Sequence, residues 1–535
     1  MPDERYDYVI VGAGPAGCVL ADRLSRDPGR RVLLLEAGGP DKAREIRVPA
    51  AFSRLFTTAY DWNYHTSKQT RLGDRELYWP RGKTLGGSTS INAQMWVRGH
   101  RADYDGWAGE CEGWSYDEVL PYFQRVERRH RAAAGSVYGT DGPLWISELR
   151  TVNPATRAFL AACAEVGLSP LAELNQPDNT GYSPTPVTQR RGRRWSAADA
   201  YLRPAAKRAN LTVRTGALVE RVDFAGGSDG TRATGVTYRH GGAERQAGAD
   251  REVLLCAGAV NTPQLLMLSG IGPADHLRDV GVEPRHDLPG VGANLQDHLA
   301  AAVAMYCTRP VTMLAAESLG QLTRFLLNRT GMLSSNVAEA VAFIHSGPDL
   351  PGPDLELIFA PSAYLDHGQT PPPDHGISIG AVLLQPESRG RITLASPDPA
   401  EPPVIDPGYL TVEADLRRLI DGLRVAERLF ATEALRPYTG APMDPYPGVV
   451  DDETLAESVR QHAETLYHPV GTCRMGSGDD AVVDCDLTVR GLTGLRVADA
   501  SVMPRINRGH TMAPTYMIAE RAADLMARGT VAPDD

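Results

Sequence analysis

Two histidines near the C-terminal end of the chain are the first candidates for acid–base chemistry. His468 precedes Pro469, and a following proline disfavours helical backbone, so we expect His468 in an extended segment. His510 lies in the polar stretch 508–515, just before an apolar helical pattern at 517–526. Imidazoles titrate near neutral pH, so two of them could divide a proton transfer. A single histidine is more often structural, and the prediction therefore depends on the elements around the pair.

The first residues of the chain predict the element that would position a cofactor beside these histidines. An apolar strand at 6–11 runs directly into the glycines Gly12, Gly14 and Gly17 and then into a helical stretch that ends at Leu24. The first glycine permits a tight turn, the second lets backbone amides approach a pyrophosphate, and the third allows the helix to pack closely on the strand. The anion would sit at the N-terminus of the helix. We predict a dinucleotide-binding unit.

A second apolar strand, at 31–35, ends in an acidic residue, Glu36. Its spacing from the glycines is that of the carboxylate that accepts hydrogen bonds from ribose hydroxyls. A carboxylate there disfavours a 2′-phosphate, so NADP is not expected.

Three more segments resemble a known family when they are taken together with this N-terminal unit. They are two further Gly-rich loops, at 81–92 and 258–272, and the C-terminal segment 495–501 with the histidines around it. Their order along the chain resembles that of the glucose-methanol-choline (GMC) family of FAD-dependent oxidoreductases, from Tyr6 to about Met526. The resemblance implies an α/β fold, with a Rossmann-like FAD-binding domain and a second α+β substrate domain built on an antiparallel sheet.

The motifs that would contact a nucleotide are dispersed, so one domain must be assembled from separate pieces. We expect residues 1–155, 205–300 and 484–535 to form the FAD-binding domain. Residues 156–204 and 301–483 should form the substrate-binding domain. A strand and turn at 390–397 and a helical pattern at 412–430 belong to the second domain.

The resemblance also implies which residues contact noncovalently bound FAD. They are Gly12, Gly14, Pro15, Ala16 and Gly17 in the first turn, Glu36 at the adenosine ribose, Ser88, Asn92 and Ala93 along the phosphates and flavin ring, Val219 at adenine, Asp499 and Ala500 under the phosphate and ribityl chain, and Thr511 and Met512 at the isoalloxazine. Ile91 occupies the position at which some relatives carry a histidine bonded to the flavin. Isoleucine cannot form that bond.

By the same resemblance, the protein oxidises a small-molecule alcohol to a carbonyl compound, with hydride passing to flavin N5. His468 would be the base, and His510 would hydrogen-bond the substrate oxygen. Because a base must be unprotonated, activity should fall at acid pH. An FAD-containing lyase of the hydroxynitrile type, which performs no net redox chemistry, is the alternative. A nonenzymatic flavoprotein finds no support in a chain that keeps both histidines.

The residues that would form the substrate pocket are less readable. Candidates for its walls are Gln94, Met95, Trp96, Asn336, Glu339, Leu466 and Tyr467, and residues 61–64 resemble the family's lid region. The electron acceptor, oxygen or another compound, is not predicted by the sequence.

Composition limits the partners and the compartment. The formal net charge is −11, which disfavours a nucleic-acid partner. The basic run 190–195 could form a nucleic-acid or membrane contact, but it more simply leads into 196–202, which resembles a structural element of the family. No apolar run approaches the ~18 residues of a membrane span. The seven cysteines are scattered, with no C-x-x-C spacing that would indicate zinc or a redox pair. We therefore expect no metal site. A strand that begins near residue 6 leaves no room for a signal peptide, so a cytoplasmic protein is expected.

Overall fold

A mixed seven-stranded sheet gathers the strands of the dinucleotide-binding unit. The computed structural model describes residues 4–132, 135–225 and 230–528. The strand order is β10-β2-β1-β13-β12-β11, and β24 also pairs with β13. The pairs from β10 to β13, and β13 with β24, are parallel, whereas β12 and β11 are added antiparallel. The strands are β1 (Glu4–Val11), β2 (Val32–Glu36), β10 (Leu211–Thr215), β11 (Ala217–Phe224), β12 (Ala233–His240), β13 (Ala243–Leu255) and β24 (Leu495–Val497).

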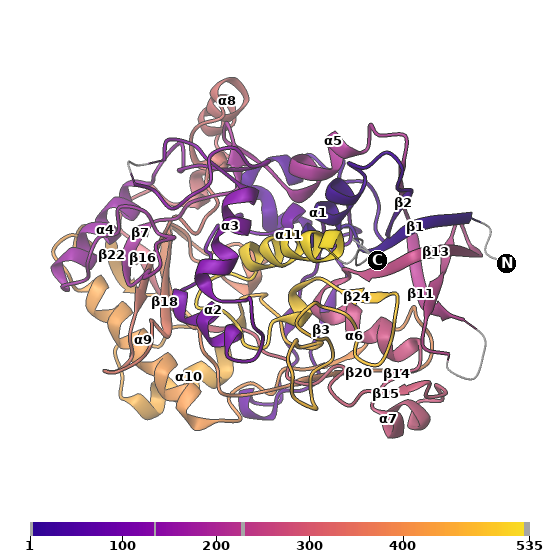
Figure 1. The fold of residues 1–535 in the computed structure, drawn as a ribbon. Coiled ribbons are helices and arrows are strands. Elements are labelled where there is room, and N and C mark those ends of the chain that lie inside the picture. The colour runs from indigo at the N-terminus through magenta and orange to yellow at the C-terminus, as the bar shows by residue number, and fades with distance from the viewer. Residues whose placement is uncertain (1–3, 133–134, 226–229, 529–535) are drawn as a thin grey trace.

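The expected strand, turn and helix at the N-terminus are confirmed. β1 leads into α1 (Pro15–Leu24), and β2 follows with every residue buried. A Cβ atom at Gly17 would lie 1.9 Å from the carbonyl oxygen of Gly12, so only glycine lets α1 approach the turn this closely. α11 (Met512–Arg528) packs along α1 (Figure 1). The first and last parts of the chain therefore form one layer.

A second seven-stranded sheet is antiparallel throughout, as expected for the substrate domain. Its order is β22-β16-β19-β18-β17-β7, and β23 pairs with β16. The helices α4 (Pro154–Glu165) and α9 (Glu413–Phe430) pack on this sheet. Its strands are β7 (Gly181–Pro184), β16 (Leu299–Cys307), β17 (Ala340–Ile344), β18 (Leu355–Ala360), β19 (Gly376–Leu383), β22 (Thr439–Pro442) and β23 (Glu464–Thr465). The domain boundaries themselves stay a prediction, and residues 1–3 and 529–535 lie outside the described residues.

The prediction of a Gly-rich loop at 258–272 is wrong. The segment that begins at Gly258 is a helix, α6 (Gly258–Leu268), and not a third Gly-rich loop. The carboxylate of Asp499 accepts hydrogen bonds from the backbone N–H of Gly258 (2.8 Å) and the hydroxyl of Thr262 (2.6 Å). A residue 241 positions away thus satisfies the first turn of the helix, and no local pattern could show this.

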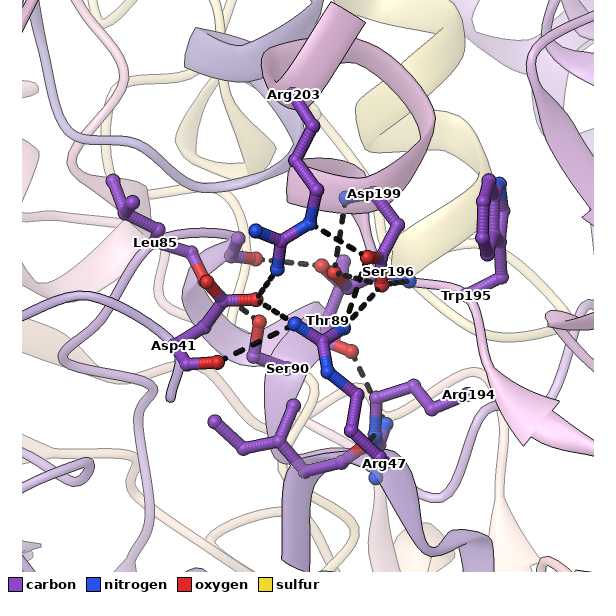
Figure 2. Close-up of polar contacts among 12 residues, drawn as sticks. Asp41, Arg47, Leu85, Thr89, Ser90, Arg194, Trp195, Ser196, Asp199 and Arg203 are labelled. Carbon is purple, nitrogen blue, oxygen red and sulfur yellow. Dashed lines mark hydrogen bonds and ion pairs between the residues drawn. The ribbon is translucent and has the colours of Figure 1, made fainter. Parts of the chain in front are cut away.

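The basic run near residue 190 contains one buried arginine and several exposed ones. Arg194 is buried, and its guanidinium donates to the carbonyl of Thr89 (3.1 Å) and the side chain of Asn92 (2.8 Å) in the second Gly-rich loop. Figure 2 shows the contact of Arg194 with Thr89 next to the ion pairs of Asp199 with Arg47 and Arg203. The structural interpretation therefore holds for Arg194, whereas the other arginines of the run are exposed.

The cysteines contain a pair that their spacing did not predict. Cys111 and Cys485 form a disulfide across 374 residues of sequence, with Cα atoms 5.2 Å apart. Their partnership is created by the fold, which brings the loop after α2 (Arg101–Ala108) next to the segment before β24. In the described residues, no helix is both long and apolar enough to cross a bilayer.

Candidate active site

A cavity of about 940 Å³ is lined by residues of both large sheets. Val219 of β11 lines one part of it, and Ala300 of β16 and Ile358 of β18 line another. The cavity brings together every residue singled out from the sequence for cofactor contact or catalysis, except Gly17, which packs under the turn. Segments more than 400 residues apart in sequence, such as those of Asn92 and Thr511, meet at this wall.

The turn at the start of α1 is shaped to accept a pyrophosphate. No side chain caps the N-terminus of α1 at Gly14, so the first backbone N–H groups of the helix have no side-chain acceptor there. A Cβ atom at Gly14 would meet only the carbonyl oxygen of Cys256, at 4.0 Å, so the space in front of the turn is open. The second Gly-rich loop touches the same point, since a Cβ atom at Gly87 would lie 2.7 Å from the Cα atom of Gly14. These groups fit the pyrophosphate of FAD.

Glu36 lies on the cavity wall at the end of β2. Its two carboxylate oxygens accept hydrogen bonds from the backbone N–H groups of Ala13 and Gly38, both at 2.8 Å. Burial raises the pKa of the Glu36 carboxyl to about 7. Each oxygen retains a lone pair, so the side chain can still accept a hydrogen bond from a ribose hydroxyl.

Other predicted cofactor residues line the cavity while their side chains serve the fold. The Asp499 carboxylate also accepts from the backbone and hydroxyl of Ser501, at 2.8 and 2.6 Å. The Asn92 amide donates to the sulfur of Met512 (3.1 Å), and its oxygen accepts from Arg194. The hydroxyl of Ser88 accepts from the N–H of Gly82 (3.1 Å). Ala93, Ala500 and Thr511 line the cavity beside them.

The two candidate histidines meet in this cavity. The ring centroids of His468 and His510 are 4.8 Å apart, and both side chains line the wall. His468 lies in an extended segment, as Pro469 predicted, which pairs with residues 296–300 through β23 and a bridge between Gln296 and Val470. His510 lies two residues before α11.

A third histidine, His298, orients the ring of His468. Its Nε2 is 3.1 Å from the carbonyl oxygen of Leu384, which can only accept, so Nε2 carries a hydrogen. Burial and the charge of His510 lower the pKa of His298 to about 3, so the ring is neutral and its Nδ1 is an acceptor. That Nδ1 lies 3.0 Å from Nδ1 of His468. His468 therefore donates from Nδ1, and its Nε2 is left with a free lone pair.

The charge environment keeps His468 unprotonated. Burial is the largest influence that lowers its pKa well below the usual value, followed by the charges of His510 and Arg81. A neutral ring with a free Nε2 is the form of histidine that can accept a proton.

Glu356 of β18 fixes the other histidine. Nε2 of His510 lies 3.1 Å from both carboxylate oxygens of Glu356, whose side chain is fully buried. A carboxylate only accepts, so Nε2 of His510 carries a hydrogen and donates to it. The opposite nitrogen, Nδ1, is not engaged by this carboxylate and can make a hydrogen bond of its own.

The backbone beside His468 is also constrained. Tyr467 has a φ of 68°, in the left-handed region that residues other than glycine rarely adopt. The N–H of Tyr467 donates to the hydroxyl of Thr465 (2.8 Å), and the N–H of His468 donates to the carboxylate of Asp297 (2.6 Å). Asp297 also accepts from the hydroxyls of Thr465 and Tyr409. The dipeptide Asp297–His298 thus holds both the backbone and the ring of His468.

The expected pocket walls are corrected at two positions. Gln94, Met95, Asn336, Leu466 and Tyr467 line the cavity, as do Trp62 and Tyr64 from the lid-like segment. Trp96 does not, because its indole is buried and donates to Glu127 (2.8 Å). Glu339 is also turned into the fold, where it accepts from the N–H of Asn153 and the hydroxyls of Thr156 and Ser335.

Sequence reasoning missed Asp297, His298 and Glu356. A usable signal existed for Glu356, which interrupts the apolar stretch 355–360, because a carboxylate on a buried strand requires a partner. His298 carried a weaker signal, as an imidazole directly before the apolar strand β16.

Comparison with known proteins identifies the family. Two family models, both described as GMC oxidoreductase, match residues 6–300 and 386–519. An uncharacterized GMC-type oxidoreductase of Mycobacterium tuberculosis is 50% identical over 98% of this chain and 99% of its own length. Mitochondrial choline dehydrogenase of Mus musculus is 42% identical over 98% of this chain and 89% of its own. The crystal structure of pyridoxine 4-oxidase from Mesorbium loti superposes with a TM-score of 0.89 at 32% identity, covering 98% of this chain and 99% of the other.

Proposed function

Because the chain belongs to the GMC oxidoreductase family, whose members depend on FAD, we propose that it oxidises an alcohol to a carbonyl compound. The observation that carries this proposal is the neutral, oriented His468, whose Nε2 lone pair is free at the cavity wall. The names of two relatives, choline dehydrogenase and pyridoxine 4-oxidase, specify alcohols and support the same chemistry.

FAD supplies the hydride acceptor at flavin N5. The protein must remove the hydroxyl proton of the substrate, because a free alcohol is too weak an acid to ionise at neutral pH. His468 accepts that proton at Nε2, while its Nδ1–H stays bonded to His298. His510, held by Glu356, hydrogen-bonds the same oxygen and steadies its developing negative charge. The two histidines can take different roles because they have different hydrogen-bond partners, His298 for His468 and Glu356 for His510.

We propose that the FAD is bound noncovalently. Ile91 lines the cavity with a buried side chain that contains no nucleophile. The other contacts follow the resemblance: the α1 turn at the pyrophosphate, Glu36 at the ribose, Val219 at adenine, and Thr511 and Met512 at the ring.

An uncharged alcohol with an apolar body suits the substrate end best. Leu466, two residues from His468, belongs to an apolar cluster with Met95, Val382 and Ile358, and all four line the cavity. Glu339, which could have balanced a cationic substrate, is instead fully engaged in the fold.

The test is anaerobic flavin reduction by a set of primary aliphatic alcohols, aryl alcohols, sugars and amino alcohols. We expect bleaching of the flavin absorbance by aliphatic or aryl alcohols and little by amino alcohols. Cleavage of a cyanohydrin, with no bleaching by any alcohol, would instead establish the lyase alternative. Reoxidation with oxygen and with an artificial acceptor would then distinguish an oxidase from a dehydrogenase.

A further inference from the structure

A helix that stands out from the molecule carries an exposed row of leucines. α8 (Leu319–Asn328) projects from the body in Figure 1. Leu319 is 79% exposed, Leu326 is 59% exposed and Leu327 is 76% exposed. Most of the large hydrophobic side chains that the described residues leave exposed are leucines between 314 and 327. Exposed apolar residues gathered on one element indicate a contact surface.

The leucines lie on one side of the helix. Leu319, Leu322 and Leu326 follow the spacing of one helical face, with Leu327 beside them. Arg324 lies on the opposite side of the helix. Phe325 is the buried residue through which α8 contacts the body. An ordinary surface helix turns its apolar face to the core. α8 instead turns its apolar face to solvent.

A group of unpaired arginines surrounds the C-terminal end of this helix. The turn at Gly192 touches it, since a Cβ atom there would lie 2.3 Å from the carbonyl oxygen of Arg329 and 3.1 Å from the side chain of Arg150. Burial and the charges of Arg329 and Arg47 lower the pKa of Arg193. Among the described residues, no carboxylate forms an ion pair with any of Arg150, Arg191, Arg193, Arg324 and Arg329.

This positive surface is unusual for a chain with a formal net charge of −11. It is also next to the cavity wall. The short helix η7 (Met332–Ser334) packs against both α8 and η2 (Pro49–Leu55), and Phe52 of η2 lines the cavity. Arg54 of η2 forms an ion pair with Glu317, just before α8.

We propose that α8 and the adjoining arginines form a docking surface for an anionic lipid bilayer. The leucines would enter the boundary between headgroups and acyl chains, and the arginines would contact lipid phosphates. α8 has 10 residues, so it is about 15 Å long and cannot cross a hydrocarbon core of about 30 Å. The contact is therefore interfacial. It does not depend on the proposed substrate or on the roles of the histidines.

Two other occupants fit these observations less well. A second copy of the chain, related by two-fold symmetry through α8, would bring the same arginines face to face without carboxylates to balance them. A specific protein partner would be expected to meet aromatic anchors or a groove, whereas α8 projects from the body (Figure 1) and its exposed large apolar side chains are leucines. A lipid surface requires neither anchors nor a complementary shape.

The test is cosedimentation of the FAD-loaded protein with vesicles of phosphatidylcholine, with and without phosphatidylglycerol. The variant Leu319→Gln/Leu326→Gln/Leu327→Gln removes the apolar face. Val449→Gln is the matched control, because Val449 is 77% exposed and lies far from α8 in sequence. A third variant, Arg191→Gln/Arg193→Gln, removes part of the charge. Light scattering without vesicles reports the oligomeric state of each protein.

We expect binding to the anionic vesicles that weakens as salt is raised. The triple leucine variant should lower the partition coefficient by at least about tenfold. The arginine variant should lower it by about fivefold for each residue, on anionic vesicles only. The proposal is overturned if the wild-type protein does not bind vesicles, or if the triple variant binds as the Val449→Gln control does. It is also overturned if the wild-type protein is a dimer, the triple variant is a monomer, and neither protein binds vesicles.

Discussion

Replacing His298 tests whether the orientation of His468 controls the chemistry. We compare two variants of similar size, His298→Leu and His298→Asn. The asparagine oxygen can occupy the position of Nδ1 and accept the Nδ1–H of His468, whereas leucine cannot. Both variants lose the hydrogen bond to the carbonyl of Leu384, so the difference between them isolates the contact with His468.

The size of the effect follows from burial. His298 is fully buried and the Nδ1–Nδ1 distance is 3.0 Å, so in His298→Leu the Nδ1–H of His468 has neither a protein partner nor bulk water. Leaving a buried donor unsatisfied costs about 1–3 kcal/mol. The ring avoids this by moving its proton to Nε2, and it then cannot act as the base. At 1.36 kcal/mol for each factor of ten, flavin reduction should slow by roughly 5- to 150-fold.

The assay is stopped-flow flavin bleaching by a good alcohol substrate under anaerobic conditions. FAD content and thermal unfolding are measured in parallel, so that loss of cofactor or of fold is not mistaken for loss of the base. We expect His298→Asn to retain a rate within about tenfold of the wild type. The reasoning would be refuted if fully loaded His298→Leu reduced its flavin at the wild-type rate, or if His298→Asn were as slow as His298→Leu.

Five other outcomes are expected from the same site. His468→Ala should slow anaerobic flavin reduction by roughly 10²-fold or more while FAD stays bound, and near-normal reduction would exclude His468 as the base. His510→Asn should keep much of the activity, because the amide still donates a hydrogen bond. His510→Ala should lose about 2.7–4 kcal/mol of transition-state stabilisation, by analogy with other oxyanion donors. Equal losses of rate in the two variants would point to proton transfer by His510. The rate of flavin reduction should stay level as the pH falls to 6.5 and should drop only below that pH. The base must be unprotonated, and burial lowers the pKa of His468 below its usual value. A fall in rate centred above pH 6.5 would contradict this. Acid should release all the FAD from the protein, since Ile91 offers no atom for a covalent bond, and flavin retained on the denatured chain would contradict this. Gly14→Val should purify as folded apoprotein, because the valine side chain would fill the space before the α1 turn. Full FAD occupancy in Gly14→Val would count against this placement of the pyrophosphate.

The sequence was most informative where the cause of a structure is local. The spacing of Gly12, Gly14 and Gly17 between two apolar strands was sufficient to predict the strand, turn and helix, because the turn needs these glycines whatever surrounds it. The extended backbone at His468 has an equally local cause, because the ring of Pro469 disfavours helical backbone at the residue before it. The family resemblance extended these local motifs to both sheets of the fold.

Tertiary structure decided the features that depend on distant partners. α6 begins at Gly258 because Asp499 caps it, and Cys111 finds Cys485 only after the chain has folded. No local pattern pairs residues so far apart, because a hydrogen bond or a disulfide is set by distance in space.

The same distinction applies to the candidate site. The sequence by itself identified His468 and His510 as the residues for acid–base chemistry, because imidazole titrates in the useful range. It could not make them unequal, because the two side chains are chemically identical. Only the fold places a neutral imidazole, His298, behind one ring and a buried carboxylate, Glu356, behind the other, 170 and 154 residues away. Those two partners determine which nitrogen of each ring carries a hydrogen, and so which nitrogen of His468 is left free to accept a proton.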